Sequence, residues 1–180
     1  MAKALPAAHY LGRAPKLAAE IVKSLCERKK RLTLAESCTG GLVSDFIVGN
    51  PGASKVFWGS FISYTDEAKI KMLGVPEEMI KSHGSVSKEV ALAMAEGALK
   101  QSGADLAVSI TGFAGPDGGE SEAPVGTVWI GLAGIEEGSS GLLRSLAKAY
   151  LFTGERNEIR EAAAAAALEW GLQHLNLSPC

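Results

Sequence analysis

A serine stands in a short polar and glycine-rich segment, Ala35–Gly41 (AESCTGG), between an apolar run and a segment of helical periodicity. The pattern predicts a strand-to-helix turn that presents Ser37 and several backbone amides to a small anionic substrate. The first amides of a helix lack intrahelical partners and carry partial positive charge, so such a turn can hold a phosphate or a developing oxyanion. Thr39, Gly40 and Gly41 are the expected ligand contacts, because glycine lets a ligand approach the backbone closely.

The same segment also has a purely structural interpretation. Ser37 or Thr39 would then be the N-cap of the following helix, and the glycines would only turn the chain. The segment lacks the GKS/T of a Walker loop, the GxGxxG of a dinucleotide-binding turn and the GxSxG of an α/β-hydrolase elbow. These residues alone leave open whether Ser37 is a cap or a nucleophile.

A serine hydroxyl is a weak nucleophile unless a neighbouring base takes its proton. Among the histidines, only His83 lies in a plausible active loop, so a Ser/His/Asp arrangement has weak support. Lys69 is the other candidate base: it would lie on the first turns of a helix that follows Tyr64, at the end of a strand. The ordinary lysine pKa of about 10.4 would have to be lowered by burial or a neighbouring cation. From spacing alone, an exposed helical lysine is the simpler alternative.

A second glycine-rich loop, Thr111–Pro124, follows another expected strand. Two such loops from one sheet can form the walls of one pocket, with Thr111 and the amide of Gly112 facing the ligand. Arg156 opens the last expected helix and Arg160 lies one turn later; a guanidinium suits phosphate because it donates two parallel hydrogen bonds. Alternatively, both arginines are solvated or pair with nearby glutamates.

The elements that must position these residues follow from the hydrophobic pattern. Strands are expected at residues 32–35, 56–64, 106–110, 125–133 and 142–152. Helices are expected at residues 15–30, 42–48, 65–72, 87–101 and 155–175. Helices and strands alternate for most of the chain, and the last two strands suggest an antiparallel pair. The sequence therefore predicts an α/β fold: a single three-layer α/β/α domain, residues 15–180, with a mixed sheet of about five strands. Residues 1–14 are expected to form a flexible N-terminal extension.

Composition narrows the class of function. The net charge of -2 argues against a nucleic-acid partner, and no apolar run approaches the ~18–20 residues that span a bilayer. The three cysteines share no CxxC spacing, so neither a zinc site nor a disulfide framework is expected, and reduced thiols fit the cytoplasm. A homo-oligomer remains possible through exposed aromatic residues such as Phe57 and Trp58, or through the alanine-rich last helix.

Several segments, in this order, resemble the CinA carboxy-terminal domain family. They are AESCTGG, YTDEAK, HGSVS, SITGFAGPDGG followed by PVGTVWIG, and FTGER with a later arginine. The resemblance runs from about Lys16 to Leu175. Characterised members of that family are nicotinamide-nucleotide amidases, also called NMN deamidases. The resemblance therefore implies hydrolysis of the carboxamide of nicotinamide mononucleotide to nicotinate mononucleotide and ammonia.

The family is thought to use a serine–lysine arrangement without a metal, and no cofactor is implied. Carried over, the resemblance implies that Ser37 is the nucleophile and Lys69 its general base. Tyr64 matches a tyrosine that helps to position the lysine or shuttles a proton.

For the substrate, Thr111 and Gly112 match a loop that contacts it. Arg156 matches a basic residue near its phosphate, and Arg160 is a second candidate. Which glycine-rich loop serves the oxyanion and which serves the phosphate stays open at this point.

Full-length members carry a further amino-terminal domain linked with ADP-ribose pyrophosphatase activity. Only residues 1–14 precede the first expected helix, so that activity is not expected here. Two other functions remain: an amidase for another small phosphorylated amide, and a non-catalytic nucleotide-binding module.

Overall fold

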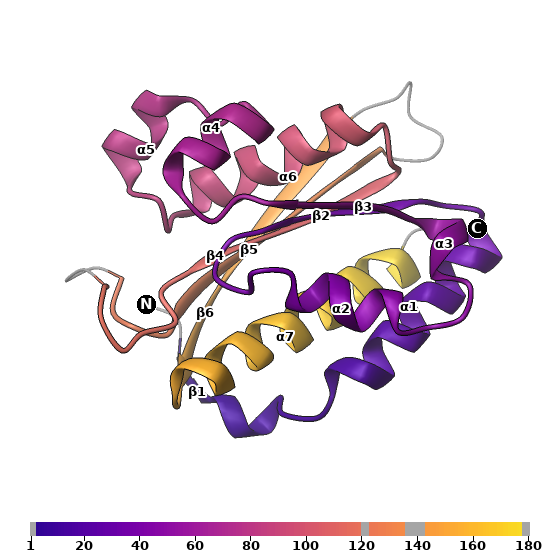
Figure 1. The fold of residues 1–180 in the computed structure, drawn as a ribbon, viewed down its shortest axis with the longest axis horizontal. Helices are drawn as coiled ribbons and strands as arrows, with labels where there is room; N and C mark the ends of the chain where they lie inside the picture. Colours follow the sequence, from indigo (N-terminus) through magenta and orange to yellow (C-terminus); the bar gives the residue numbers. More distant parts are fainter. Residues whose placement is uncertain (1–2, 120–122, 136–142, 178–180) are drawn as a thin grey trace.

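The structure, a computed structural model, describes residues 3–119, 123–135 and 143–177. A mixed sheet with strand order β1-β6-β5-β4-β2-β3 separates two layers of helices (Figure 1). The strands are β1 (Ala4–Pro6), β2 (Leu32–Glu36), β3 (Phe57–Ile62), β4 (Leu106–Gly112), β5 (Thr127–Ile135) and β6 (Leu143–Thr153). β2 pairs in parallel with both β3 and β4, whereas β5 pairs antiparallel with β4 and β6. This confirms the expected α/β class with a mixed sheet.

Helices cover both faces of the sheet. One layer contains α4 (Asp66–Leu73), α5 (Glu77–His83) and α6 (Lys88–Ser102). The other contains α1 (Ala14–Arg28), α2 (Leu42–Val48) and α7 (Arg156–Leu177), with the short α3 (Ala53–Val56) beside it. Each layer encloses its own hydrophobic core against the sheet.

The alanine run of α7 lies in the larger core. Residues Ala162–Ala167 are all fully buried, and α7 packs against α1 as well as the sheet. Small side chains permit that close packing on several sides at once. The alanine run is therefore buried within the fold and is not exposed for contact with a second copy of the chain.

The strand count and the start of the chain correct the sequence-based expectation. The sheet has a sixth strand, β1, which pairs in parallel with β6 and places Leu5 opposite Phe152. A 3-10 helix, η1 (Ala7–His9), follows it. Residues 4–9 are thus part of the fold rather than a flexible extension. A strand of three residues is too short to show a hydrophobic period in the sequence. It is defined by its pairing with β6, which only the structure shows.

Two short helices, α3 and α5, are also additions to the expected elements. The boundaries of the longer elements agree with the expected ones to within a few residues. Ser87 accepts a hydrogen bond from the Val90 amide at the start of α6, and Gly103 ends that helix with φ +61°.

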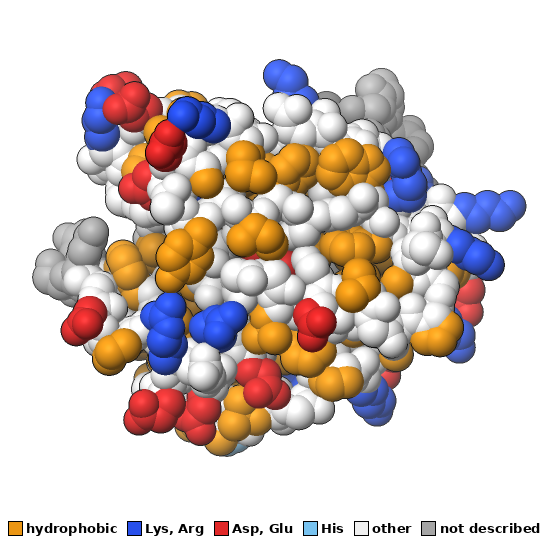
Figure 2. Space-filling view, in the orientation of Figure 1, with side chains coloured by type: hydrophobic (Ala, Val, Ile, Leu, Met, Phe, Trp, Pro, Cys, Tyr) orange, Lys and Arg blue, Asp and Glu red, His pale blue; other side chains and the backbone are white. Residues whose placement is uncertain are grey.

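At the open edge of the sheet, Figure 2 shows hydrophobic side chains gathered along β3, where Trp58 is exposed and stacks on Phe61. A dimer through such residues stays a prediction.

Gly97 on α6 marks the tightest crossing of the α4–α6 layer. A Cβ at this position would lie 2.0 Å from the carbonyl oxygen of Leu73, the last residue of α4. We expect Gly97→Ala to lower the free energy of unfolding by about 1–3 kcal/mol, because the helices must move apart. Urea unfolding followed by circular dichroism measures this.

Gly171→Ala on α7 is the matched control, since its Cβ would meet only the side chains of Ile21 and Val108, at 3.3 and 3.5 Å. It should cost much less than Gly97→Ala. Equal unfolding midpoints for the two variants would contradict the close crossing of α4 and α6.

Candidate active site

A pocket of about 220 Å³ opens where β2, β3 and β4 end. Because these three strands are parallel to one another, their carboxyl ends meet at one edge of the sheet, which is where open α/β sheets bind ligands. The pocket gathers six of the residues predicted from sequence. They are Ser37, Tyr64, Lys69, Thr111, Gly112 and Arg156. Thr39, Gly40, Gly41 and Arg160 are not among its lining residues.

The turn after β2 is organised by a buried carboxylate. Glu36 is fully buried, and its Oε2 accepts hydrogen bonds from the amides of Gly41 (3.0 Å) and Val43 (3.1 Å). Its Oε1 accepts from the amide and the hydroxyl of Ser44, at 3.0 and 2.6 Å. Glu36 therefore satisfies the first amides of α2 and places a negative charge at the positive end of the helix. The Gly41 amide, expected to face a ligand, donates to Glu36 instead.

This arrangement excludes one of the two roles that the sequence left open for Ser37, that of helix cap. The N-cap of α2 is Gly41, with φ +97° and no side-chain capping bond, so neither Ser37 nor Thr39 caps the helix. Ser37 is held by its backbone: its amide donates to Ile110 O at 2.9 Å, and its carbonyl accepts from Gly40 N at 3.0 Å. Its side chain is thereby presented to the pocket.

Two further side chains of the turn are buried. Thr39 Oγ1 has no hydrogen-bond partner among the described residues and does not line the pocket. Burial raises the pKa of the Cys38 thiol to about 12. A thiol with that pKa stays protonated at neutral pH and is a poor nucleophile, so Ser37 is the better candidate.

Arg160 holds the turn from the opposite side. Its Nε donates to Cys38 O at 3.2 Å and its Nη2 to Thr39 O at 2.8 Å, while Nη1 donates to Asn157 at 3.1 Å. These contacts place the guanidinium of Arg160 on the backbone of the turn, outside the pocket. They bind α7 to a segment more than a hundred residues earlier in the chain.

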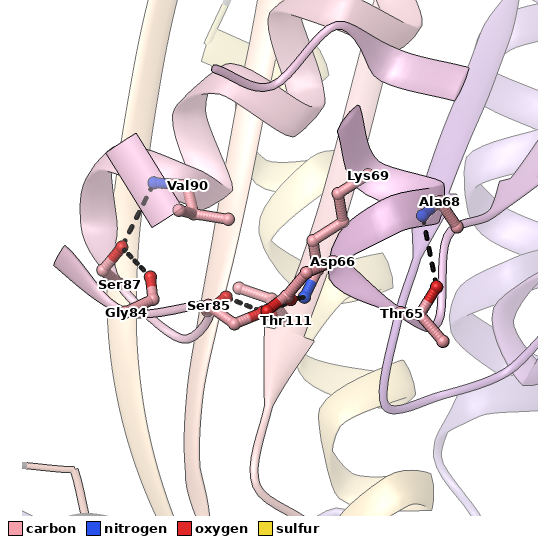
Figure 3. A network of polar contacts seen from close by, with 9 residues as sticks. All are labelled: Thr65, Asp66, Ala68, Lys69, Gly84, Ser85, Ser87, Val90 and Thr111. Carbon is pink, nitrogen blue, oxygen red and sulfur yellow. Dashed lines mark hydrogen bonds and ion pairs between the residues drawn. The ribbon is translucent and has the colours of Figure 1, made fainter. Parts of the chain in front are cut away.

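Lys69 is buried, with only 2% of its surface exposed, so the alternative of an exposed helical lysine is wrong. Thr65 caps α4 by accepting from the Ala68 amide, and this fixes the helix turn that carries Lys69 (Figure 3). The amine lies 3.3 Å from Asp66 Oδ1 and donates a hydrogen bond to Ser85 Oγ. Burial lowers the pKa of Lys69, although the Asp66 carboxylate opposes that change. A lysine with a lowered pKa is suited to act as a base near neutral pH.

Ser85 was not singled out from the sequence, although it lies in the HGSVS segment. It follows α5, and Gly84, with φ +76°, turns the chain toward the pocket. Thr111 Oγ1 donates to the Ser85 carbonyl at 2.9 Å, so Thr111 holds the Ser85 loop against the end of β4. His83 does not line the pocket; it ends α5 with its Nδ1 3.8 Å from Glu89.

Tyr64 and Arg156 lie at the mouth of the pocket. Arg156 Nη2 donates to the Tyr64 hydroxyl at 3.2 Å, and Nη1 donates to Gly115 O. Tyr64 is 56% exposed, and Arg156 is also exposed. Figure 2 shows basic side chains over the N-terminal end of α7, the helix that carries Arg156. The mouth thus presents a cation on the side where the loop after β4 meets α7.

Within residues 3–119, 123–135 and 143–177, no three histidine, cysteine, aspartate or glutamate side chains gather as a metal site would require. In the same ranges, no helix has the length and apolarity needed to cross a membrane.

Comparison with known proteins now places the chain. The sequence profile of the CinA C-terminal domain matches residues 14–175. The chain belongs to this family. A CinA-like protein of Thermotoga maritima is 47% identical over 149 residues, which is 83% of this chain and 35% of that protein. The chain spans about a third of the length of the curated relatives it matches.

Solved structures of the CinA superfamily share the fold. The competence/damage inducible protein CihA from Agrobacterium tumefaciens is 38% identical, with a TM-score of 0.82 over 93% of this chain and 98% of that chain. The competence damage-inducible protein A (ComA) from Klebsiella pneumoniae is 31% identical, with a TM-score of 0.85 over 92% and 99%. The CinA C-terminal fold therefore accounts for almost the whole chain.

The role of Glu36 can be tested by Glu36→Gln. A glutamine would point an NH2 group at the amides of α2 in place of an accepting oxygen, so we expect about 1–3 kcal/mol loss of unfolding free energy. Hydrogen exchange should also become faster at the Gly41, Val43 and Ser44 amides. Glu20→Gln, at an exposed ion pair with Lys16, is the control and should change stability by less than about 1 kcal/mol. Unchanged exchange at the three amides would contradict the capping role.

Proposed function

We propose that this chain is an amidase that hydrolyses the carboxamide of nicotinamide mononucleotide to nicotinate mononucleotide and ammonia. One observation carries the proposal: a buried lysine with a lowered pKa lines the same small pocket as a serine that is not used as a helix cap. The family resemblance supplies the substrate class. The free thiols of Cys26 and Cys38 fit a reducing cytoplasm, where we place the reaction.

The chemistry follows from the two groups. Neutral Lys69 takes the proton of Ser37 as the serine oxygen attacks the carboxamide carbon. Protonated Lys69 then gives that proton to the leaving nitrogen, and ammonia departs. Water hydrolyses the acyl-serine by the same proton transfers in reverse. Cys38, the residue after Ser37, also lines the pocket with Lys69, which supports the closeness of Lys69 to the turn that carries Ser37.

The contacts of the turn suggest where the two anionic parts of the reaction are held. Glu36 engages the Gly41 amide, and Gly40 N donates to Ser37 O. The amides of Cys38 and Thr39 are engaged by neither of these contacts. We assign them to the oxyanion, since they follow the nucleophile directly.

The phosphate is then assigned to the mouth. Arg160 donates to the backbone of the turn, whereas Arg156 is exposed beside the pocket. The pocket volume of about 220 Å³ is below the roughly 300–1,000 Å³ of sites that enclose a drug-sized ligand. It therefore suits the nicotinamide ring, with the ribose phosphate reaching out to Arg156. Tyr64, bonded to Arg156, would line the path between them.

The nucleophile and base are tested by Ser37→Ala and Lys69→Arg. We expect each to lower kcat for ammonia release by about 1,000-fold or more, because arginine stays protonated and cannot accept the serine proton. Lys71→Arg on the same helix and Ser82→Ala on α5, both exposed, should retain wild-type rates. Near-wild-type release by Ser37→Ala would contradict the mechanism. A panel of other phosphorylated amides distinguishes this activity from a related amidase, and binding without turnover indicates a nucleotide-binding module.

The phosphate assignment is tested by Arg156→Ala. We expect KM for the mononucleotide to rise about 10-fold or more, the size of a lost charge-assisted hydrogen bond. The KM for nicotinamide riboside, which lacks the phosphate, should change much less. Arg13→Ala, at a distant ion pair with Glu169, is the control. Equal loss for both substrates would show that Arg156 only supports Tyr64 and the loop at Gly115.

A further inference from the structure

The loop between α5 and α6 brings a second serine, Ser85, into the pocket. Its shape is fixed by hydrogen bonds: Ser87 Oγ donates to Gly84 O at 3.0 Å and accepts from the Val90 amide at 3.3 Å. Thr111 Oγ1 holds the Ser85 carbonyl from β4. Ser85 is therefore anchored from two elements and meets Lys69 at a defined position (Figure 3).

The direction of each hydrogen bond around Ser85 can be worked out. A serine hydroxyl has one proton, and an ionised carboxylate can only accept. Burial would raise the pKa of Asp66, but the Ser85 hydrogen bond and the charge of Lys69 lower it, so Asp66 is a carboxylate at neutral pH. The Ser85 hydroxyl donates its hydrogen bond to Asp66 Oδ1 at 2.5 Å. Its oxygen is then left to accept from Lys69, in agreement with the contact observed.

These directions constrain the lone pair of Lys69. A neutral amine has two N–H bonds and one lone pair around its nitrogen, besides the bond to carbon. One N–H points to Ser85 Oγ, and the Asp66 carboxylate, 3.3 Å away, accepts the other. The lone pair must occupy the remaining direction. Ser37 lines the same pocket as Lys69 and Ser85.

We propose that Ser85 is a positioning residue, whose hydroxyl turns the lone pair of neutral Lys69 toward Ser37. The inference rests on the proposed function, in which Lys69 is the general base. The proton of Ser37 passes to Lys69 while the Ser37 oxygen bonds to the carboxamide carbon. The Ser85 hydroxyl keeps its own proton throughout, hydrogen-bonded to Asp66. Without Ser85, the amine rotates and its lone pair meets Ser37 in a smaller fraction of molecules.

The same contacts raise a rival, in which Ser85 itself is the nucleophile activated by Lys69. Its hydroxyl donates its hydrogen bond to Asp66 and accepts one from the amine, which disfavours this role. A covalent probe separates the two serines. A fluorophosphonate should label Ser37, identified by peptide mass spectrometry, and its reaction requires no nicotinamide substrate.

The experiment compares wild type with Ser85→Ala and Ser85→Thr. We expect Ser85→Ala to lower kcat about 100-fold, with KM changed less than about threefold, because a misplaced base costs rate rather than binding. The rate of Ser37 labelling should fall by a similar factor. Ser85→Thr keeps a hydroxyl and should recover most of both rates. Ser82→Ala, an exposed serine whose hydroxyl bonds to Glu78 O, is the matched control and should match wild type.

Thermal unfolding checks that each variant is folded. Where Ser85→Ala is not, Ser85→Cys replaces it: the thiol has nearly the same size but accepts hydrogen bonds weakly, so the same loss of kcat and labelling rate is expected. Labelling of the wild-type protein on Ser85 would overturn the proposal. So would kcat and labelling rates within about twofold of wild type in Ser85→Ala or Ser85→Cys. Should wild type release no ammonia from nicotinamide mononucleotide, the proposed function fails, while the labelling rates still decide the role of Ser85.

Discussion

The site depends on one buried carboxylate at the end of β2. Glu36 accepts three amides and a hydroxyl from the start of α2, so the helix needs no cap from Ser37 or Thr39. A buried carboxylate without donors would be very costly, and here the donors and the helix dipole both stabilise it. The consequence is a turn that is rigid in its backbone and leaves the Ser37 side chain available to the pocket.

The surroundings of Lys69, unlike those of Glu36, do not fully stabilise its charged form. Lys69 is almost as deeply buried as Glu36, but its ion-pair partner, Asp66, is half-exposed. Burial therefore outweighs the attraction of Asp66 and lowers its pKa. Hydrogen-bond donors stabilise the charge of buried Glu36, whereas burial favours the neutral form of Lys69. The lowered pKa of Lys69 is the property that a lysine needs to accept a proton near neutral pH.

Two arginines of α7, Arg156 and Arg160, contact different parts of the site. Arg160 ties the helix to the Cys38 and Thr39 carbonyls, while Arg156, one turn earlier, reaches Tyr64 and Gly115 at the mouth. A single helix thus supports the turn with one guanidinium and presents another to solvent. The profile match of the CinA C-terminal domain family extends to residue 175 and so includes both arginines of α7.

The sequence by itself determined the order of the long helices and strands and the turn at Ser37, because these follow from spacing within about ten residues. It marked Lys69 as a candidate base but did not show that this lysine is buried. It did not determine which group caps α2: Ser37 and Thr39 have the right chemistry, but Glu36 reaches the amides from the strand. Nor did it reveal the contact between Lys69 and Ser85, sixteen residues apart, the hold of Arg160 on the turn, or the strand at Ala4–Pro6. Those features depend on how distant segments pack, and only the tertiary structure decided them.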